Sequence, residues 1–396
     1  MRDFLVDYAG MLVRWLHVVA AIAWIGSSFY FVWLDNHLRP ADPPEEGVAG
    51  ELWSVHGGGF YNSRKYRLAP ARLPSHLHWF KWEAYWTWIS GFALLALVYY
   101  SRPRELLISP DRPGLGTWGA VAISVGALAV AYPVYDALCR SPLGANGLVL
   151  AAVGTVASAA AFQGLTYVFG GRGAFLQIGS MLGTVMAANV LMVIIPGQRR
   201  SVAAMREGRE PDPRDGTRGK QRSVHNNYIT LPVVLLMLSN HYAVLYTDER
   251  SWLLVGAILV AGMLIRHFVN LRHTGRLVWS LPAAALAILL GMGAYLAPWD
   301  TDGADAPARA VAFEAVAPVI ETRCATCHAA EPTQPGVTIT AAGIELDDPG
   351  EIVAQARRIH DQAVVTEAMP LGNVTGMTDA ERALIDAWFT GGAPGP

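Results

Sequence analysis

Residues 174–195 read AFLQIGSMLGTVMAANVLMVII, an apolar stretch without a charged side chain. A helix of ~20 residues crosses the hydrocarbon core of a bilayer, where only helices and closed barrels satisfy their own backbone polar groups. This stretch therefore predicts a membrane-spanning helix. The composition agrees, because 53% of the 396 residues are hydrophobic and 16% are charged, whereas soluble domains contain about a quarter charged residues.

Seven further stretches of comparable length and hydrophobicity lie on either side of it. Together they predict an all-α fold in which an eight-helix transmembrane bundle makes up most of the chain. The first stretch is too long for a cleavable signal peptide and lacks a small-residue cleavage site, so we expect it to remain as the first helix. The expected helices cover residues 11–34, 79–100, 117–138, 147–169, 174–195, 225–246, 251–270 and 278–297.

Positively charged residues are distributed unequally between the two sides of the predicted bundle. The connections after the first, third, fifth and seventh helices carry sixteen Lys and Arg, whereas the opposite side, before the tail, carries six. Loops rich in Lys and Arg stay in the cytoplasm. Both termini are therefore expected outside the cytoplasm.

The peptide CATCH, residues 324–328, is a Cys-x-x-Cys-His signature, the attachment site of c-type haem. Both thiols form thioethers with the haem, and the adjacent histidine is held against one face of the iron. A zinc site would need further ligands, but the only other cysteine, Cys139, lies far upstream in an apolar stretch. We expect covalent haem c on Cys324, Cys327 and His328, on the periplasmic side of a bacterial inner membrane, where haem is attached.

The second axial ligand is expected from Met369, which precedes Pro370 in an irregular segment suited to presenting a thioether. His/Met ligation of the iron raises the haem potential and favours electron transfer over oxygen chemistry. Met377 and His360 are the competing candidates. Met377 lies just before a helix, however, and His360 lies in a basic helical run that is expected to be solvated.

The tail is expected to form a small α-helical cytochrome c domain. A helix near 308–322 precedes the haem peptide, and Thr378 and Glu381 form a capping box that opens a last helix. A stretch containing Pro and Asp separates this domain from the membrane helices. The expected domains are a transmembrane domain (1–297), a linker (298–307) and a periplasmic cytochrome c domain (308–396).

Ionisable side chains inside a bilayer are costly, so they mark candidate functional sites. His17 on the first helix and His241 at the end of the sixth are expected at similar depths near the outer side, since a helix rises 1.5 Å per residue. Two histidines at one level on different helices could ligate a second haem, a haem b in the membrane domain, or serve a relay. They could also be hydrogen-bonded packing residues.

A second polar group is expected toward the cytoplasmic side, with Arg266, His267, His225 and Glu83 as its ionisable members. A planar, anionic, amide-rich substrate would need Arg for its charge, Asn for its amide edges and His as a base. We expect Arg266 as the clamp and His267 or His225 as the base, although Glu83 and Arg266 could instead form a structural ion pair. The amides at this level are Asn189, Asn226, Asn227 and Asn270.

The first connection contains HGGGFY at 56–61. Three glycines allow the backbone to approach a ligand or another strand, and a plain flexible turn explains them equally well. No Lys-Ser or Lys-Thr pair follows, so a phosphate loop is not indicated. The net charge of −2 is uninformative about partners. No basic stripe or nucleic-acid motif occurs outside the connections expected in the cytoplasm, so we expect no nucleic-acid partner.

Most of the chain resembles the membrane-integral urate oxidases of bacteria, in which an eight-helix membrane domain is fused to a periplasmic cytochrome c. The tail resembles theirs in CATCH and in MPLGN at 369–373. The membrane segments that carry the resemblance are WLHVV (15–19), WIG (24–26), WLDN (33–36), HGGGFY (56–61), HNNY (225–228) and SNHY (239–242).

This resemblance implies a membrane-bound oxidoreductase of purine degradation that hydroxylates urate to 5-hydroxyisourate. Electrons would pass to the fused cytochrome c without peroxide formation, and then to a downstream cytochrome c or a terminal oxidase. The residues alone leave two other interpretations open. One is a membrane-anchored c-type cytochrome that carries electrons from quinol to a separate enzyme, and the other is a small-solute transporter with an appended redox sensor.

Overall fold

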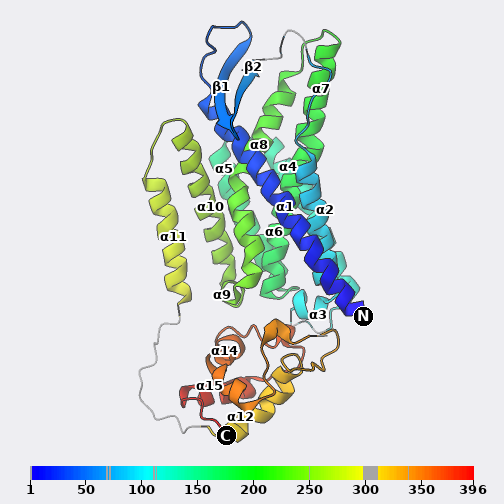
Figure 1. Cartoon of the computed structure of the whole chain (residues 1–396), viewed down its shortest axis with the longest axis vertical. Helices are drawn as coiled ribbons and strands as arrows, with labels where there is room; N and C mark the ends of the chain where they lie inside the picture. The colour runs from blue at the N-terminus through cyan, green and yellow to red at the C-terminus, as the bar shows by residue number, and fades with distance from the viewer. Residues whose placement is uncertain are drawn as a thin grey trace.

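The computed structural model describes residues 2–67, 70, 73–109, 112, 114–248, 250–297, 311–337 and 339–396. The fold is mostly helical, with one two-stranded sheet among the described residues. Figure 1 shows the long helices side by side and a smaller helical domain beyond one end of them. The predicted linker, 298–307, and residues 308–310 of the predicted haem domain lie outside the described residues.

Long helical segments occupy the positions of the predicted apolar stretches. Five of the described helices are long and apolar enough to cross a membrane, at Tyr8–His37, Thr117–Arg140, Gly147–Thr166, Gly171–Arg206 and Ser251–His273. The long segments are α1 (Arg2–His37), α2 (Trp82–Leu94) continuing as η1 (Leu95–Tyr100), α4 (Thr117–Arg140), α5 (Gly147–Thr166), α6 (Gly171–Ala188) continuing as η3 (Asn189–Ile194) and α7 (Ile195–Arg206), α8 (Pro213–Leu238), α10 (Ser251–His273) and α11 (Ser280–Leu296).

Two helix boundaries differ from the hydropathy-based prediction. Helix α8 begins at Pro213 instead of near 225, because Asp212 accepts a hydrogen bond from the backbone of Arg214 and Pro213 occupies the first helical turn. Helix α7 likewise continues to Arg206 through polar sequence. Hydropathy detects only the apolar part of a helix, so these polar extensions could not be found from it.

Short elements connect the long helices at the end nearer the C-terminal domain. They are α3 (Pro103–Leu106), η4 (Ser239–His241) and α9 (Ala243–Tyr246), with η2 (Pro142–Ala145) at the opposite end. The chain after α3 is attached to the start of α6, since Ser109 N donates to Val168 O at 3.0 Å and Gly170 N donates to Leu107 O at 3.0 Å.

The first connection folds into a hairpin of β1 (Val48–His56) and β2 (Gly59–Tyr66). His56 pairs with Gly59, and the two intervening residues, Gly57 and Gly58, have positive φ angles of 56° and 80°. Two successive positive φ angles define a tight two-residue hairpin turn, which only glycine, Asn or Asp adopt easily. The glycine run therefore forms the turn between the two strands, as in the second of the two interpretations, but with a defined two-residue conformation.

The core of the helical region lies between α4, α5, α6, α8 and α10. Phe162 and Phe175 pack edge to face there with ring centroids 4.8 Å apart, and Leu236 and Val255 are fully buried. Large apolar side chains also cover the outside of the bundle, where Trp118 is 83% exposed. Such an apolar exterior is expected when the surrounding solvent is lipid.

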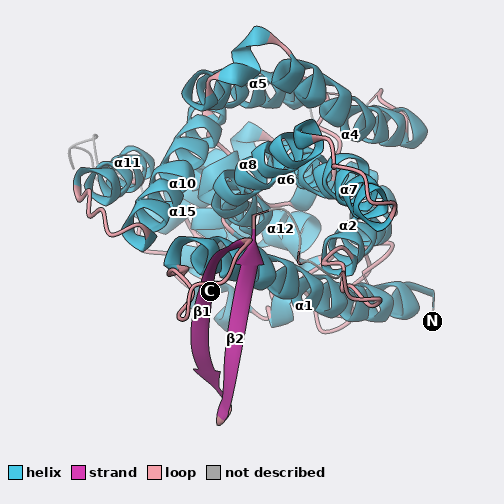
Figure 2. Ribbon diagram, turned by 90° about the horizontal axis from the view of Figure 1, so that it is seen from above, coloured by secondary structure: helices cyan, strands magenta, loops and turns pink. Residues whose placement is uncertain are grey.

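Polar contacts also join neighbouring helices inside the bundle. Ser124 on α4 donates to Gln177 Oε1 on α6 at 2.6 Å, and Gln177 Nε2 donates back to Ser124 O at 2.9 Å. Hydrogen bonds of this kind hold helices together where the hydrophobic effect cannot do so. Figure 2 shows these helices clustered around α6 and α8, with the hairpin projecting to one side.

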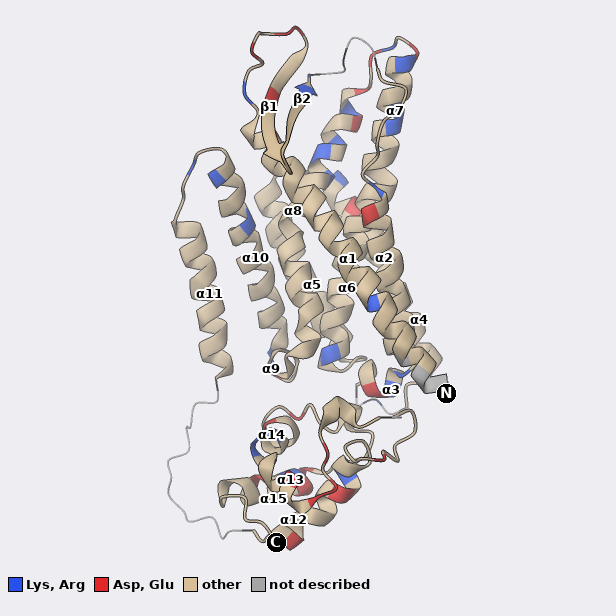
Figure 3. Ribbon diagram, viewed as in Figure 1, with Lys and Arg blue, Asp and Glu red and all other residues tan. Residues whose placement is uncertain are grey.

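The two ends of the helical region carry different charges. The N-terminus, α3 and α9 lie at the end next to the C-terminal domain, whereas the hairpin and the α7–α8 connection lie at the other end. Figure 3 shows Lys and Arg gathered at the hairpin end. We call the end next to the C-terminal domain the outer end, and the end with the hairpin and the α7–α8 connection the inner end.

The C-terminal domain packs a first and a last helix against each other. Phe313 on α12 and Trp388 on α15 lie with ring centroids 6.4 Å apart, and the predicted Thr378–Glu381 capping box is present. The elements are α12 (Phe313–Ile320), η5 (Glu321–Ala325), η6 (Ala341–Gly343), α13 (Pro349–Ala354), α14 (Ala356–His360), η7 (Asp361–Val365), η8 (Leu371–Asn373) and α15 (Asp379–Thr390).

Candidate functional site

The CATCH peptide follows α12 and η5 as a compact turn in the C-terminal domain. The backbone N–H groups of Cys327 and His328 both donate to Cys324 O at 3.0 Å. His328 Nδ1 lies 3.3 Å from Ile344 O, which leaves the opposite ring nitrogen, Nε2, as the atom able to bind a metal. A backbone carbonyl on one ring nitrogen commonly orients a metal-binding histidine.

Burial controls the protonation of Cys324 and His328. It raises the pKa of the Cys324 thiol to about 12. Burial lowers the pKa of His328, against the opposing effect of the Ile344 and Ala341 carbonyls. The imidazole is therefore neutral at pH 7, and neutral imidazole is the form that binds iron.

The three candidates for the second axial ligand have different surroundings. Met369 is half-buried, and Arg382 fixes its loop by donating to Met369 O at 2.9 Å. Met377 is 4% exposed and packs in the core of the domain. His360 is paired with Asp386, 2.8 Å from its Nε2, and is stacked on a phenylalanine, so it is not solvated as predicted.

These residues fit a covalently bound haem. Cys324 and Cys327 are free thiols with a neutral histidine beside them, and a half-buried methionine is available in a restrained loop. Cys139, by contrast, is buried in the helical region with its sulfur 3.8 Å from His225 Nδ1. It therefore lies in surroundings unrelated to CATCH and does not supply CATCH with the further ligand that a zinc site would need.

A buried polar cluster lies between α8 and α10 in the helical region. Asn227 Oδ1 accepts hydrogen bonds from Arg266 Nε and from Asn270 Nδ2, both at 2.9 Å. The Arg266 guanidinium lies 3.6 Å from the centre of the Phe29 ring of α1. A planar cation stacked on an aromatic ring keeps its edge available for hydrogen bonds. We call Asn227, Arg266 and Asn270 the amide–arginine cluster.

Several polar atoms of this cluster have no hydrogen-bond partner among the described residues. They are Arg266 Nη2, Asn227 Nδ2 and Asn270 Oδ1, and all three atoms are buried. An unpaired buried polar atom costs about 1–3 kcal/mol, and more if it is charged. Two donors and one acceptor are thus held ready for a ligand that carries a negative charge together with amide groups.

A histidine lies beside the cluster on the same pair of helices. His267 Nδ1 is 2.7 Å from the hydroxyl of Tyr228. Tyr228 follows Asn227 on α8, and His267 follows Arg266 on α10, so both pairs cross the same helix interface. This arrangement provides a base next to the amide–arginine cluster.

His225, the alternative base, belongs to a different cluster on another side of α8. Its Nδ1 lies 2.7 Å from the Tyr135 hydroxyl on α4, and the same hydroxyl accepts from Asn189 Nδ2 at 3.1 Å. Asn189 Nδ2 also donates to Asn226 Oδ1 at 2.9 Å. The fold therefore separates the two predicted bases, and only His267 adjoins Arg266.

Glu83 takes no part in either cluster. Arg266 is bound to Asn227 and Phe29, and Glu83 forms no ion pair within the described chain. The alternative role of Arg266 as a partner of Glu83 is therefore not found. A buried ion pair joins Arg222 to Asp136 instead, with Nη2 and Oδ1 2.6 Å apart.

The two outer histidines have different surroundings. His17 Nδ1 lies 3.0 Å from Thr87 O and 3.1 Å from Ser90 Oγ, so this ring packs against α2. His241 lies on η4 with an exposed side chain. His17 is thus hydrogen-bonded through Nδ1 at the α1–α2 contact.

Sequence reasoning missed the aromatic members of both clusters. Phe29, Tyr135 and Tyr228 carry no charge, and Phe29 and Tyr135 lie in apolar sequence, where aromatic residues are usual. Tyr228 could have been found, because it is one residue from Asn227 and would face the seventh helix at the level of His267. Phe29 could not, since the crossing of α1 over α10 is a tertiary feature.

Comparison with known proteins gives one match for the helical region. A family model described as urate oxidase N-terminal matches residues 3–297. Neither the curated proteins nor the solved structures contain a match. The matched residues include both clusters and end before the C-terminal domain.

Proposed function

Because the chain belongs to the urate oxidase N-terminal family, we propose that it is a membrane-bound urate oxidase that converts urate to 5-hydroxyisourate. The family makes the protein an oxidoreductase with urate as its substrate. The route of the electrons is part of our proposal. It runs to the chain's own cytochrome c domain, and from there to a downstream cytochrome c or a terminal oxidase, so that no peroxide is formed.

The unpaired atoms of the amide–arginine cluster are the observation that supports urate binding at this place. Urate is planar, is an anion at neutral pH, and carries ring N–H groups and carbonyl oxygens. Arg266 Nη2 and Asn227 Nδ2 can donate to its oxygens, and Asn270 Oδ1 can accept from a ring N–H. Binding would thus satisfy the orphaned atoms, which gives the site a preference for this kind of ligand.

The reaction needs a base, a cationic group that binds the urate anion (the clamp), and an acceptor for the two electrons. The urate monoanion and one water give 5-hydroxyisourate, one proton and two electrons. We assign the clamp to Arg266, whose stacking on Phe29 orients the guanidinium. We assign the base to His267, which the Tyr228 hydroxyl positions at 2.7 Å. His225 and Glu83 are not placed in the reaction.

Haem c, when bound, supplies an acceptor that takes one electron at a time. Cys324 and Cys327 would tether it, and His328 and Met369 would bind its iron. The proposed domains are an eight-helix membrane domain (1–297) and a cytochrome c domain (308–396). We place both termini and the haem domain in the periplasm, supported by the Lys and Arg gathered at the inner end.

The site and the haem peptide lie toward opposite ends of the membrane domain. Arg266 is fifteen residues along α10 from Ser251, which corresponds to about 22 Å of helix. That separation is long for a single electron transfer. An intermediate carrier in the membrane domain, such as the predicted haem b near His17 and His241, would shorten it.

Anaerobic reduction of the purified full-length protein tests the proposal. Urate should reduce the haem c absorption bands in the absence of any other donor. Reduction by a quinol but not by urate would favour the membrane-anchored electron carrier, and urate uptake into liposomes without haem reduction would favour a transporter.

A further inference from the structure

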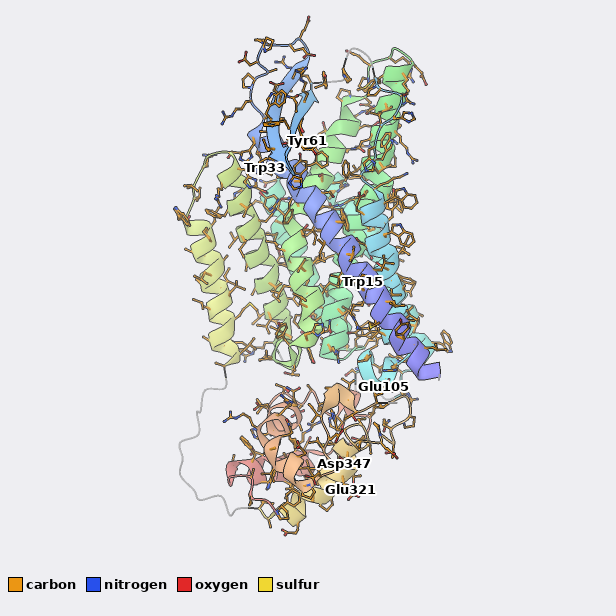
Figure 4. The ribbon with its side chains drawn as sticks, in the orientation of Figure 1. Trp15, Trp33, Tyr61, Glu105, Glu321 and Asp347 are labelled. Atoms are coloured by element: carbon orange, nitrogen blue, oxygen red, sulfur yellow. The ribbon has the colours of Figure 1, made fainter. Side chains whose placement is uncertain are left out.

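The C-terminal domain contacts the membrane domain at the short helix α3. Gly372, in η8, lies against this helix so closely that a Cβ atom added to it would be 2.6 Å from Arg104 O and 2.8 Å from Glu105 Cα. No side chain fits in that space. Figure 4 shows Glu105 at the outer end of the bundle, next to the C-terminal domain.

This contact is connected directly to the loop that carries Met369. Gly372 is three residues beyond Met369, whose N–H donates to Gln362 O at 2.9 Å and whose carbonyl accepts from Arg382. The far side of the loop is held as well, because Asn373 exchanges two hydrogen bonds with the backbone of Met377. The position of Met369 is therefore linked to the surface that contacts α3.

Glu105 contributes two of the three atoms nearest to a Cβ placed on Gly372, its Cα and its carbonyl oxygen. One carboxylate oxygen of Glu105, Oε2, is buried without a hydrogen-bond partner among the described residues.

Helix α3 is itself attached firmly to the membrane domain. Leu107, directly after it, is 1% exposed, and its carbonyl accepts from Gly170 at the start of α6. Ile108 forms a β-bridge with Phe169, which is fully buried. Helix α3 is thus connected, through Leu107 and Ile108, to the packed core of the helical bundle.

We propose that α3 is a docking platform for the C-terminal domain, on which Gly372 allows backbone-to-backbone approach to Arg104 and Glu105. The Met369 loop, one of the two segments that would hold the haem, then lies toward the membrane domain. The docked state is the one that receives electrons, and this last step rests on the proposed function. Gly372 is a positioning residue in this scheme.

Hydrogen–deuterium exchange on the full-length protein tests the docking without urate. Gly372→Ala should raise exchange in residues 103–109 by about tenfold or more, as expected when a methyl group is forced into a contact without room for it. Gly376→Ala is the matched control. Gly376 has a similar positive φ of 68° in the same loop, but its nearest neighbour is Arg323 Nη1 at 3.8 Å.

The control separates lost docking from backbone strain, because both alanines are strained but only one meets α3. Unchanged exchange in 103–109 for Gly372→Ala, or an equal rise for both variants, would overturn the docking platform. Equal haem content and far-red absorption in both variants would show that the Met369 loop is intact.

Anaerobic haem reduction then tests the electron step. Gly372→Ala should slow reduction by urate about tenfold, while a small external reductant reduces the haem at the wild-type rate; Gly376→Ala should change neither. If wild-type haem is not reduced by urate but exchange distinguishes the two variants, the proposed function fails and the docking stands. If urate reduces both variants equally and exchange does not distinguish them, the docking fails and the function stands.

Discussion

Arg266 donates a hydrogen bond from Nε to Asn227 Oδ1, 2.9 Å away, and the two side chains are 3% and 2% exposed. A buried guanidinium normally pairs with a carboxylate, because an uncompensated charge in a low-dielectric interior is costly. Here its fixed neighbours are an amide and the ring of Phe29. The missing negative charge is, in our proposal, that of urate.

The first prediction concerns this clamp. Arg266→Gln should raise the KM for urate at least tenfold, since removal of one partner of a buried charged pair costs about 2–5 kcal/mol. Arg272→Gln, on the exposed side of the same helix, is the control and should leave KM unchanged. If Arg266→Gln destabilises the protein but leaves the KM for urate unchanged, Arg266 is only a structural partner of Asn227.

The second prediction distinguishes the two histidines. His267→Gln should lower kcat by about 10²–10⁴-fold, the range expected for loss of a general base, with little effect on KM. Tyr228→Phe should have a smaller effect, because it removes only the hydroxyl that orients the imidazole. His225→Gln should retain most of the activity. Steady-state kinetics measure all three, and a larger loss in His225→Gln than in His267→Gln would move the site to the Tyr135 cluster.

The third prediction concerns the haem. Met369→Ala should leave haem covalently attached through Cys324 and Cys327 but remove the far-red absorption that a sulfur–iron bond gives ferric haem. Met377→Leu should keep that band, because Met377 packs in the core. Absorption spectra of the purified variants decide between them, and the reverse pattern would make Met377 the ligand.

The fourth prediction is topological. Protease added to cells with a permeabilised outer membrane should release the C-terminal domain, while the α7–α8 connection around Arg209 stays protected by the inner membrane. This follows from the Lys and Arg at the inner end. Cleavage near Arg209 together with a protected C-terminal domain would invert the orientation.

The fifth prediction is a pH dependence of the C-terminal domain. The backbone N–H of Thr378 and the Arg323 guanidinium lower the pKa of Glu381 below its ordinary 4.5. The stability from this ionised carboxylate is thus present above pH 4.5 and is lost as the pH falls through the lowered value. Glu381→Gln should cost less than about 1 kcal/mol at pH 7, because Gln still completes the capping box but forms no ion pair with Arg323.

Urea unfolding of the full-length protein, followed by the circular dichroism of the haem bands, measures this cost. The difference between wild type and Glu381→Gln should shrink as the pH is lowered below 4.5. Asp379→Asn, in the same first turn but exposed, should change the stability less. A mutational cost that does not vary with pH would mean that the carboxylate charge is not involved.

The local sequence was enough to predict where the long helices lie and to single out the CATCH peptide. Apolar runs as long as residues 174–195 have few alternatives to a helix, and the CATCH signature and the Thr378–Glu381 box are local patterns whose chemistry depends on spacing alone. The hairpin turn at Gly57 and Gly58 is also local, although its strands were not predicted, because their side chains do not alternate clearly between apolar and polar.

Only the tertiary structure decided which polar residues share a site. His225 and Asn227 are two positions apart on α8, but successive helical residues are rotated by about 100°, so the two side chains point toward different neighbouring helices. His225 meets Tyr135, whereas Asn227 meets Arg266 and Asn270. The contact of Gly372 with α3 could not be predicted from the sequence either, because it depends on how two domains that are far apart in the chain pack together.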